Sequence, residues 1–241
     1  MTLELSNFDA VTFDVYGTLI DWEPAITSFL SDWAKRRGLA APGDELLMTF
    51  DRARSIIQTE RPAHLYPDIL RRCFDRICAD YAVEPDAETR EAFAASPKTW
   101  PAYPDSRTGL KALQARAKIG ALSNIDDASL QASSDILGVK FDFLVTAERV
   151  GAYKPDTPHF ETALTELDAL GIPRERILHV GQSLRADVAP ANRLGLTSVW
   201  VHRPGRVMGL SGAPDAKPDL TVSSLAELVA AIAPTNAASF T

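Results

Sequence analysis

The chain has 241 residues, enough for one large domain or for a core domain with a smaller insert. Hydrophobic residues make up 46% and charged residues 24%, which is globular usage and excludes a disordered or fibrous chain. The formal net charge of −7 gives no general attraction for polyanions. We therefore expect no nucleic-acid binding and a small-molecule substrate instead.

The apolar runs and the cysteines of the sequence indicate whether the protein inserts into a membrane and in which compartment it is located. No stretch approaches the roughly 18 consecutive apolar residues that a spanning helix needs, so we expect no membrane insertion. The first residues lack the basic segment and apolar stretch of a signal peptide. Cys73 and Cys78 are too few for a disulfide framework and are expected to be buried thiols. These features predict a cytoplasmic protein, and a homodimer is a possible assembly.

Five short runs rich in Val, Ile, Leu and Phe are each followed by a longer amphipathic segment. The runs comprise residues 9–14, 117–123, 143–147, 177–181 and 198–202, with a weaker sixth run at 220–222. Near-continuous apolar runs are typical of strands covered on both faces, and their alternation with helices predicts a parallel sheet. We therefore expect an α/β fold with an open, Rossmann-like parallel sheet.

The interval between the first two runs is far longer than a strand crossover needs. Helical patterns fill most of it, at residues 24–37, 44–58, 67–81 and 87–95. We expect a helical cap domain at 21–97 and an α/β core domain made of 1–20 and 98–241. Asp105 is placed to cap a core helix that runs to Ala115. The cap should lie over the carboxyl ends of the strands, where open α/β sheets bind ligands.

Polar side chains stand at the ends of the apolar runs. Asp14 ends the first run, Ser123 ends the second, Lys154 follows the third, and Asp187 lies shortly after the fourth. The carboxyl ends of parallel strands meet at one sheet edge, so these side chains should share one crevice. A buried Asp14 needs a charged partner, which Lys154 can supply. An ionised, partly desolvated carboxylate is a competent nucleophile.

These motifs resemble those of the haloacid dehalogenase-like hydrolase superfamily. The matching strings are FDVYGTL at 13–19, LSN at 122–124, KPD at 154–156 and HVGQSLRAD at 179–187. Each string is short, but four in order at the ends of the right strands are specific for the fold. The helical insert matches the cap of the superfamily's first class, and the resemblance covers nearly the whole chain.

The resemblance implies a catalytic role for five residues. Asp14 would be the nucleophile, and Thr18 would bond the nucleophile's loop or carboxylate. Ser123 would bind the substrate's anionic group. Lys154 would hold the carboxylates and balance their charge. Asp187 would lie beside Lys154 and position either that lysine or the hydrolytic water.

Further positions are candidates for contact with substrate. Asn124 matches a position that contacts the leaving halide in the family's dehalogenases. Those enzymes also use a cap arginine for the halide, and Arg52, Arg54 and Arg61 are all candidates here. Trp22 is either an aromatic wall of the pocket or a core anchor.

Two positions separate dehalogenases from phosphatases in this superfamily. The phosphatases carry a second aspartate two residues after the nucleophile, which protonates the leaving alcohol. Here that residue is Tyr16, whose unperturbed pKa of roughly 10 suits it poorly to that role. The 2-haloacid dehalogenases resemble this chain in having an aromatic residue there. Gln182 stands where phosphatases have an acidic magnesium ligand, so we expect no metal and no other cofactor.

Other positions depart from the dehalogenase pattern. Leu184, Ala186 and Phe160 stand where those enzymes have an asparagine, an aromatic residue and a tyrosine. The attacking water would then need another partner, either Gln182 or Asp187. The leading hypothesis is a metal-independent hydrolase of small 2-haloacids. The alternatives are a magnesium-dependent phosphatase with Gln182 as a neutral ligand, and a catalytically decayed member that binds a small acid or a protein partner.

Overall fold

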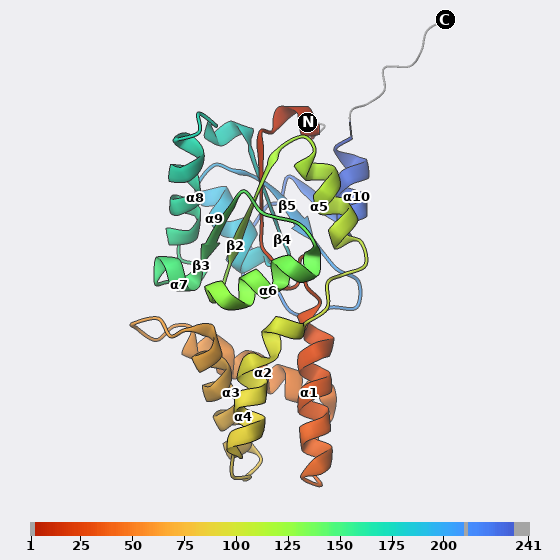
Figure 1. Ribbon diagram of the computed structural model, residues 1–241, viewed down its shortest axis with the longest axis vertical. Helices are drawn as coiled ribbons and strands as arrows, with labels where there is room; N and C mark the ends of the chain where they lie inside the picture. Colours follow the sequence, from red (N-terminus) through yellow and green to blue (C-terminus); the bar gives the residue numbers. More distant parts are fainter. Residues whose placement is uncertain (1–2, 210–211, 234–241) are drawn as a thin grey trace, which may run out of the picture.

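A six-stranded parallel sheet forms the centre of the computed structural model, which describes residues 3–209 and 212–233 (Figure 1). The strand order is β3-β2-β1-β4-β5-β6. The strands are β1 (Ala10–Phe13), β2 (Lys118–Ser123), β3 (Phe143–Thr146), β4 (Ile177–Gly181), β5 (Thr197–Val201) and β6 (Leu220–Val222). All neighbours pair in parallel, with Ala10 opposite both Lys118 and Ile177. The predicted parallel α/β sheet is confirmed.

Helices cover both faces of this sheet. One face packs against α5 (Ser106–Gln114), α6 (Asp127–Leu137) and α10 (Leu225–Ala231), and the other against α8 (Pro158–Asp168) and α9 (Ala189–Arg193). Short elements complete the core: η1 (Leu5–Asn7), α7 (Ala147–Val150), η3 (Arg174–Arg176) and a π-turn, η4 (Leu184–Val188). Every residue of β1 and β4 is buried, because both faces of these strands are covered.

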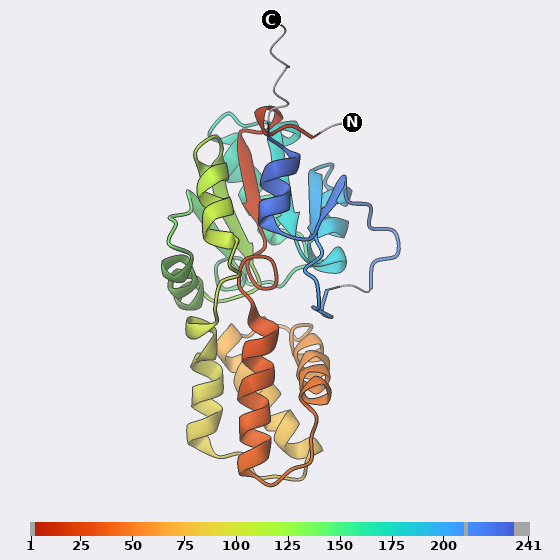
Figure 2. The same ribbon diagram turned by 90° about the vertical axis from the view of Figure 1, so that its right-hand side faces the viewer.

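A bundle of helices lies at one end of the sheet (Figures 1 and 2). It comprises α1 (Trp22–Arg36), α2 (Gly43–Ile57), α3 (Tyr66–Asp80), α4 (Ala87–Ala95) and the 3-10 turn η2 (Ser96–Thr99). Aromatic rings fill its interior, with Trp33 against Phe74 at 5.5 Å and Phe50 against Phe93 at 5.8 Å between ring centroids. Cys73 and Cys78 are buried in α3 as free thiols. The bundle thus buries its own apolar face.

The two segments that connect bundle and sheet run side by side. Ile20 forms an antiparallel bridge with Ala102, and the Asp21 amide donates to the Pro101 carbonyl at 2.7 Å. We propose that this crossing separates a cap domain at 21–97 from a core domain made of 1–20 and 98–241.

A second connection joins α1 to the loop after β5. Asp21 forms an ion pair with Arg206, and the buried Glu23 carboxylate accepts hydrogen bonds from the amides of Val207 and Met208, both at 3.2 Å. Burial raises the pKa of Glu23, and the two backbone donors partly offset that effect. Both carboxylates therefore hold this core loop against the first helix of the bundle.

Two details of the predicted elements need correction. Helix α1 begins at Trp22, two residues before Pro24, because a proline in the first helical turn removes no intrahelical hydrogen bond. Asp105 precedes α5 but makes no capping bond to it. Its carboxylate instead accepts from the amides of Leu225 and Ala226 at the start of α10. Asp105 thus caps a helix that is 120 residues further along the chain.

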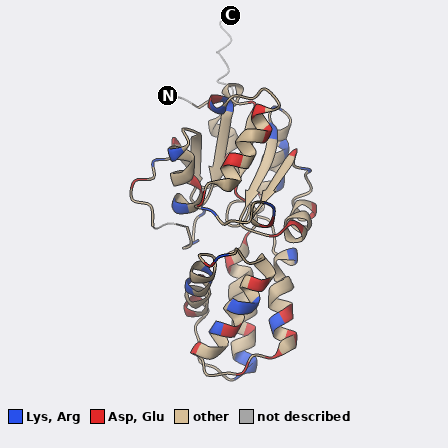
Figure 3. Cartoon of the chain, turned by 90° about the vertical axis from the view of Figure 1, so that its left-hand side faces the viewer, with Lys and Arg blue, Asp and Glu red and all other residues tan. Residues whose placement is uncertain are grey.

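Charges of both signs alternate over the helices of the bundle, whereas the strands carry few (Figure 3). No helix in the described part of the chain has the length and hydrophobicity that crossing a bilayer requires.

Asp105→Ala tests how much the fold depends on this distant cap. Asp105 also pairs with Arg203 at 2.8 Å, and Arg203 donates to the Thr18 carbonyl at 2.7 Å. We expect the free energy of unfolding, measured in urea, to fall by about 2–4 kcal/mol because a buried cation loses its partner. Asp44→Ala, at an exposed position in the first turn of α2, should cost less than about 1 kcal/mol. Equal losses in the two variants would contradict this role.

Candidate active site

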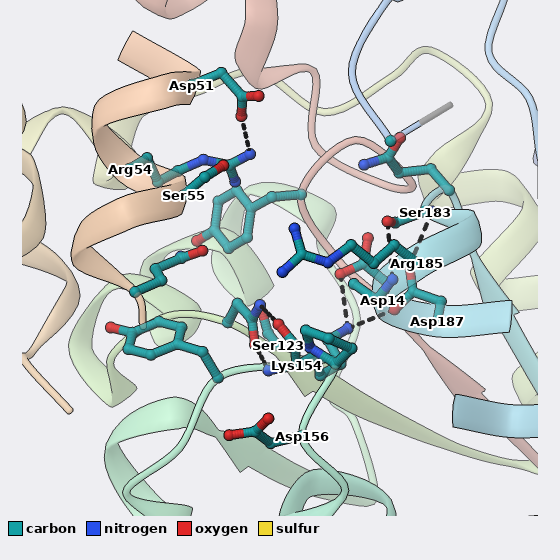
Figure 4. Close-up of a pocket in the computed structure, with 18 of the residues that line it drawn as sticks. Asp14, Asp51, Arg54, Ser55, Ser123, Lys154, Asp156, Ser183, Arg185 and Asp187 are labelled. Carbon is teal, nitrogen blue, oxygen red and sulfur yellow. Dashed lines mark hydrogen bonds and ion pairs between the residues drawn. The ribbon is translucent and has the colours of Figure 1, made fainter. Parts of the chain in front are cut away.

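A cavity of about 430 Å³ lies between the carboxyl ends of the strands and the helical bundle (Figure 4). The sheet side contributes Asp14, Ser123 and Asp187, and α2 and α3 contribute Arg54 and Tyr66. The cavity therefore forms only where the two parts of the fold meet.

Asp14 follows β1 directly and extends the sheet ladder, with its amide donating to the Val180 carbonyl at 2.9 Å. The chain then turns sharply through Gly17, whose φ of +96° is a left-handed conformation that favours glycine. This turn brings the Thr18 hydroxyl back to the Asp14 carboxylate, to which it donates at 2.8 Å. The local sequence Asp-Val-Tyr-Gly-Thr thus holds one carboxylate oxygen in place.

Lys154 is the cation of the site, and its ammonium is almost fully buried. It donates to Asp14 Oδ1 at 3.0 Å, to Asp187 Oδ1 at 2.7 Å and to the Leu122 carbonyl at 2.7 Å. All three ammonium protons therefore have acceptors. The two carboxylates raise the pKa of Lys154 against the effect of burial, so the side chain stays protonated.

Asp187 lies in the π-turn η4, directly against the end of β4. A Cβ atom at Gly181 would lie 2.4 Å from the Asp187 carboxyl carbon, so only glycine permits this approach. The second oxygen of Asp187 accepts the Ser183 amide at 3.0 Å. Both oxygens of this carboxylate are thus committed to protein donors.

The two carboxylates of the cluster differ in acidity. Burial raises the pKa of Asp14 to about 6, with the Lys154 charge opposing this rise and the Asp187 charge adding to it. Burial also tends to raise the pKa of Asp187. The contacts of Asp187 with Lys154 outweigh this effect of burial, and the pKa of Asp187 is lowered to about 2. Asp14 is therefore the more basic carboxylate, and both are ionised above neutral pH.

A buried histidine of β4, His179, lies next to the carboxylate cluster. His179 Nε2 lies 3.7 Å from Asp187 Oδ1, and Nδ1 lies 2.9 Å from the Thr12 hydroxyl. Its ring contacts Phe160 edge to face. Burial lowers the pKa of His179, so the ring is neutral, as expected for a core histidine.

Ser123 and Asn124 lie at the end of β2 and line the cavity. The Ser123 hydroxyl is fully buried and has no hydrogen-bond partner among the described residues, so it is free to bond a ligand. The Asn124 amide, in contrast, brackets the backbone of Lys154, accepting its N–H at 2.7 Å and donating to its carbonyl at 3.1 Å. Asn124 therefore positions the lysine loop, in addition to facing the cavity.

Tyr16 and Gln182 both line the cavity as expected. The Tyr16 hydroxyl lies 2.7 Å from the Ser133 hydroxyl, and burial raises the pKa of this phenol. Gln182 lies between two glycines, and a Cβ at Gly17 or Gly209 would lie within 2.7 Å of its side chain. Neither residue supplies a carboxyl group to the site.

The candidate cap residues occupy different places. Arg54 lines the cavity, forms an ion pair with Asp51 and stacks on Trp22 at 5.2 Å. Trp22 does not line the cavity; its buried ring supports Arg54 from behind. Arg61 lies at the cavity wall and pairs with Asp156 of the core.

Arg52 must be removed from the candidates. Its exposed side chain bonds Thr49 outside the cavity, because the cavity-facing side of α2 is that of Asp51, Arg54 and Gln58.

Sequence reasoning missed several lining residues. Arg185, Ser55, Gln58, Tyr66 and Tyr153 all face the cavity. The helical spacing of Asp51, Arg54, Ser55 and Gln58 is a signal that could have identified the cap wall. Arg185 lies inside the fourth motif, but its neighbours there do not indicate which way its side chain points.

The donor set does not fit a magnesium ion. Lys154 already bridges Asp14 and Asp187, and the remaining oxygens of these carboxylates accept protein hydrogen bonds. Gln182 adds only a neutral amide, whereas magnesium prefers charged oxygens in octahedral array. A divalent ion would compete with the buried ammonium for the same oxygens. Within the described residues, no group of three or more His, Cys, Asp or Glu side chains could hold a metal.

The site thus consists of an aspartate–lysine–aspartate cluster under a helical bundle. Residues 8–195 match the family model of haloacid dehalogenase-like hydrolases. The chain belongs to this family, which confirms the resemblance seen in its motifs.

Similar proteins fall into more than one functional group. The (S)-2-haloacid dehalogenase of Pseudomonas sp. (strain YL) is 26% identical over 226 residues, covering 91% of this chain and 92% of that protein. The pyrimidine 5'-nucleotidase YjjG of Escherichia coli is 35% identical over 122 residues, covering 49% and 51%. The crystal structure of a defluorinating L-2-haloacid dehalogenase superposes with a TM-score of 0.77 at 22% identity, covering 95% and 98%. The last likeness establishes the shared fold.

Lys154→Met tests the central ion cluster. Removal of the ammonium leaves two carboxylates buried without a counter-charge, so we expect the free energy of unfolding to fall by about 3–5 kcal/mol at pH 7.5. Lys118→Met is the matched control because its ammonium is exposed, 3.3 Å from Asp142, and should cost less than about 1 kcal/mol. Urea denaturation measures both changes. A loss no greater at Lys154 than at Lys118 would refute the proposed dependence.

Proposed function

We propose that the protein hydrolyses a small 2-haloacid to a 2-hydroxyacid through an ester on Asp14, without a metal ion. The observation that carries this proposal is the lack of a free carboxylic acid in the described cavity wall. Asp14 and Asp187 share Lys154, Asp51 pairs with Arg54, and Asp156 pairs with Arg61. An alcohol leaving group needs a proton donor, whereas a halide leaves without one.

In the first step, an ionised Asp14 oxygen attacks the carbon that bears the halogen. The new C–O bond forms as the carbon–halogen bond breaks, and the halide leaves with the bonding electrons. Thr18 and Lys154 hold the carboxylate in the orientation of attack. Ser123 would donate its free hydroxyl proton to the substrate's carboxylate.

In the second step, water attacks the carbonyl carbon of the Asp14 ester. The acyl C–O bond breaks, Asp14 is regenerated, and its new oxygen comes from water. Once Asp14 is esterified, Asp187 is the remaining ionised carboxylate of the cluster, and we propose that it orients the attacking water. Of the two protons of that water, one goes to the departing alkoxide of the 2-hydroxyacid and the other is released to solvent. Lys154 holds Asp187 in place throughout. The products are one halide, one 2-hydroxyacid and one proton.

A phosphatase is the second candidate, since the chain is also similar to the pyrimidine 5'-nucleotidase YjjG over about half of its length. The side chains that phosphatases would need are the ones that this chain lacks. Tyr16 bonds Ser133, and burial raises its pKa, so this phenol is a weaker proton donor to a leaving alcohol than a carboxylic acid would be. Gln182 is a poor magnesium ligand. The haloacid reaction therefore fits the cavity better. The cytoplasmic location and the homodimer remain predictions.

Halide release from (S)-2-chloropropionate, followed by ion chromatography, tests the proposal directly. We expect turnover by the wild type in the presence of a chelator, and a loss of at least about 1,000-fold in Asp14→Asn because the nucleophile is removed. Asp44→Asn, a surface carboxylate of the bundle, should retain full activity. In H₂¹⁸O, a single turnover should place the label on Asp14, which mass spectrometry can locate.

Two results would count against the haloacid reaction. One is full activity of Asp14→Asn. The other is hydrolysis of phosphate esters, but not of haloacids, that is lost with chelator and restored by magnesium.

The pKa of Asp14 predicts the acid limb of the pH–rate profile. Only the ionised carboxylate attacks, so kcat/KM should fall below a pH of about 6, by about tenfold for each further unit. Thr18→Val removes a hydrogen bond that stabilises the ionised form, and should move this limb to higher pH. Stopped assays between pH 4.5 and 8 measure both profiles. A rate that stays constant down to pH 5 would be inconsistent with this assignment.

A further inference from the structure

The cavity wall contains four cationic side chains, and three of them have carboxylate partners. Lys154 bonds two aspartates, Arg54 pairs with Asp51, and Arg61 pairs with Asp156. For Arg185, no hydrogen bond or ion pair occurs with any of residues 3–209 and 212–233. Arg185 therefore supplies the one uncompensated positive charge of the described wall.

The backbone around Arg185 is firmly held, although its guanidinium is not. The Ser183 side chain accepts the Ala186 amide at 3.0 Å, and the Ser183 carbonyl accepts the Asp187 amide at 2.9 Å. These bonds fix the π-turn η4, from which the exposed Arg185 side chain extends into the cavity (Figure 4). A free guanidinium on an anchored turn is well placed to meet a ligand.

The net charge of the reaction centre is unfavourable for binding an anion, and an unpaired arginine can offset it. With both carboxylates ionised, the cluster of Asp14, Lys154 and Asp187 carries a net charge of −1 and repels an anionic substrate. Ser123 offers only a neutral hydroxyl to such a substrate. A guanidinium matches a carboxylate with two parallel hydrogen bonds, and it is less strongly hydrated than an ammonium. An arginine without a partner can therefore offset the repulsion.

We propose that Arg185 binds the carboxylate of the substrate and selects ionised acids over uncharged analogues. This inference rests on the proposed function, since it concerns the acid that Asp14 would attack. It makes Arg185 a specificity-determining residue on the core side of the cavity. Arg54 and Arg61 are already paired with the carboxylates of Asp51 and Asp156.

Binding without turnover provides the sharpest test. In the Asp14→Asn background, isothermal titration measures the affinity for (S)-2-chloropropionate and for its uncharged amide. Adding Arg185→Gln should weaken binding of the acid by roughly 10- to 100-fold, the range for a charge-assisted contact, and change binding of the amide less than about twofold. Arg52→Gln, at an exposed position outside the cavity, is the matched control and should change neither affinity.

Turnover gives an independent readout in the protein that retains Asp14. Arg185→Gln should raise KM for the acid by a similar factor with little change in kcat, and Arg185→Lys should recover part of the loss because it restores the charge. A purely structural role would instead lower binding of acid and amide together.

The outcomes separate this inference from the proposed function. If acid binding depends on Arg185 but no halide is released, the anion-binding role stands and the haloacid reaction fails. The inference is overturned if Arg185→Gln binds the acid as tightly as its parent, or if neither protein binds the acid. In both cases halide release by the wild type still reports on the reaction itself.

Discussion

The site depends on one buried ammonium. Lys154 joins Asp14 at the end of β1, the Leu122 carbonyl near the end of β2, and Asp187 in the turn after β4. Burying these three charges is costly, and only their mutual contacts offset the cost. The lysine thus holds three sequence-distant segments in one arrangement. Burial raises the pKa of Asp14 despite the Lys154 charge, whereas the pKa of Asp187 is lowered, so that two aspartates in one cluster differ in acidity.

The position of the bundle over the cavity depends on how the bundle is joined to the sheet. The crossing of the two connecting segments, together with the contacts of Asp21 and Glu23 with the loop after β5, sets the position of α1. That same loop contains Arg203, which bonds the Thr18 carbonyl and pairs with Asp105. The loop after Asp14 and the bundle are therefore supported by one segment. Changes there would affect both the orientation of the Asp14 carboxylate and the shape of the cavity.

We propose that two side chains of the cavity, Tyr16 and Gln182, decide which reaction the site favours. A carboxylate at the position of Tyr16 would add a proton donor, and one at the position of Gln182 would add a charged oxygen to the wall. The cavity wall around them is polar, but its carboxylates are paired with cations. Such pairing is consistent with the proposed displacement of a leaving group that needs no proton. It also leaves Arg185 as a cation available to a ligand.

The sequence alone was sufficient to predict the parallel sheet, the helical insert, and the convergence of Asp14, Ser123, Lys154 and Asp187. Apolar runs and motif order are local signals, and parallel strands necessarily bring their carboxyl ends to one edge. The tertiary structure alone decided three further points: Asp105 caps α10, Trp22 supports Arg54 from behind, and Arg185 enters the cavity. These depend on how elements far apart in the chain pack together. The periodicity of a single helix or strand indicates on which face of that element a side chain lies. It does not indicate which other element packs against that face.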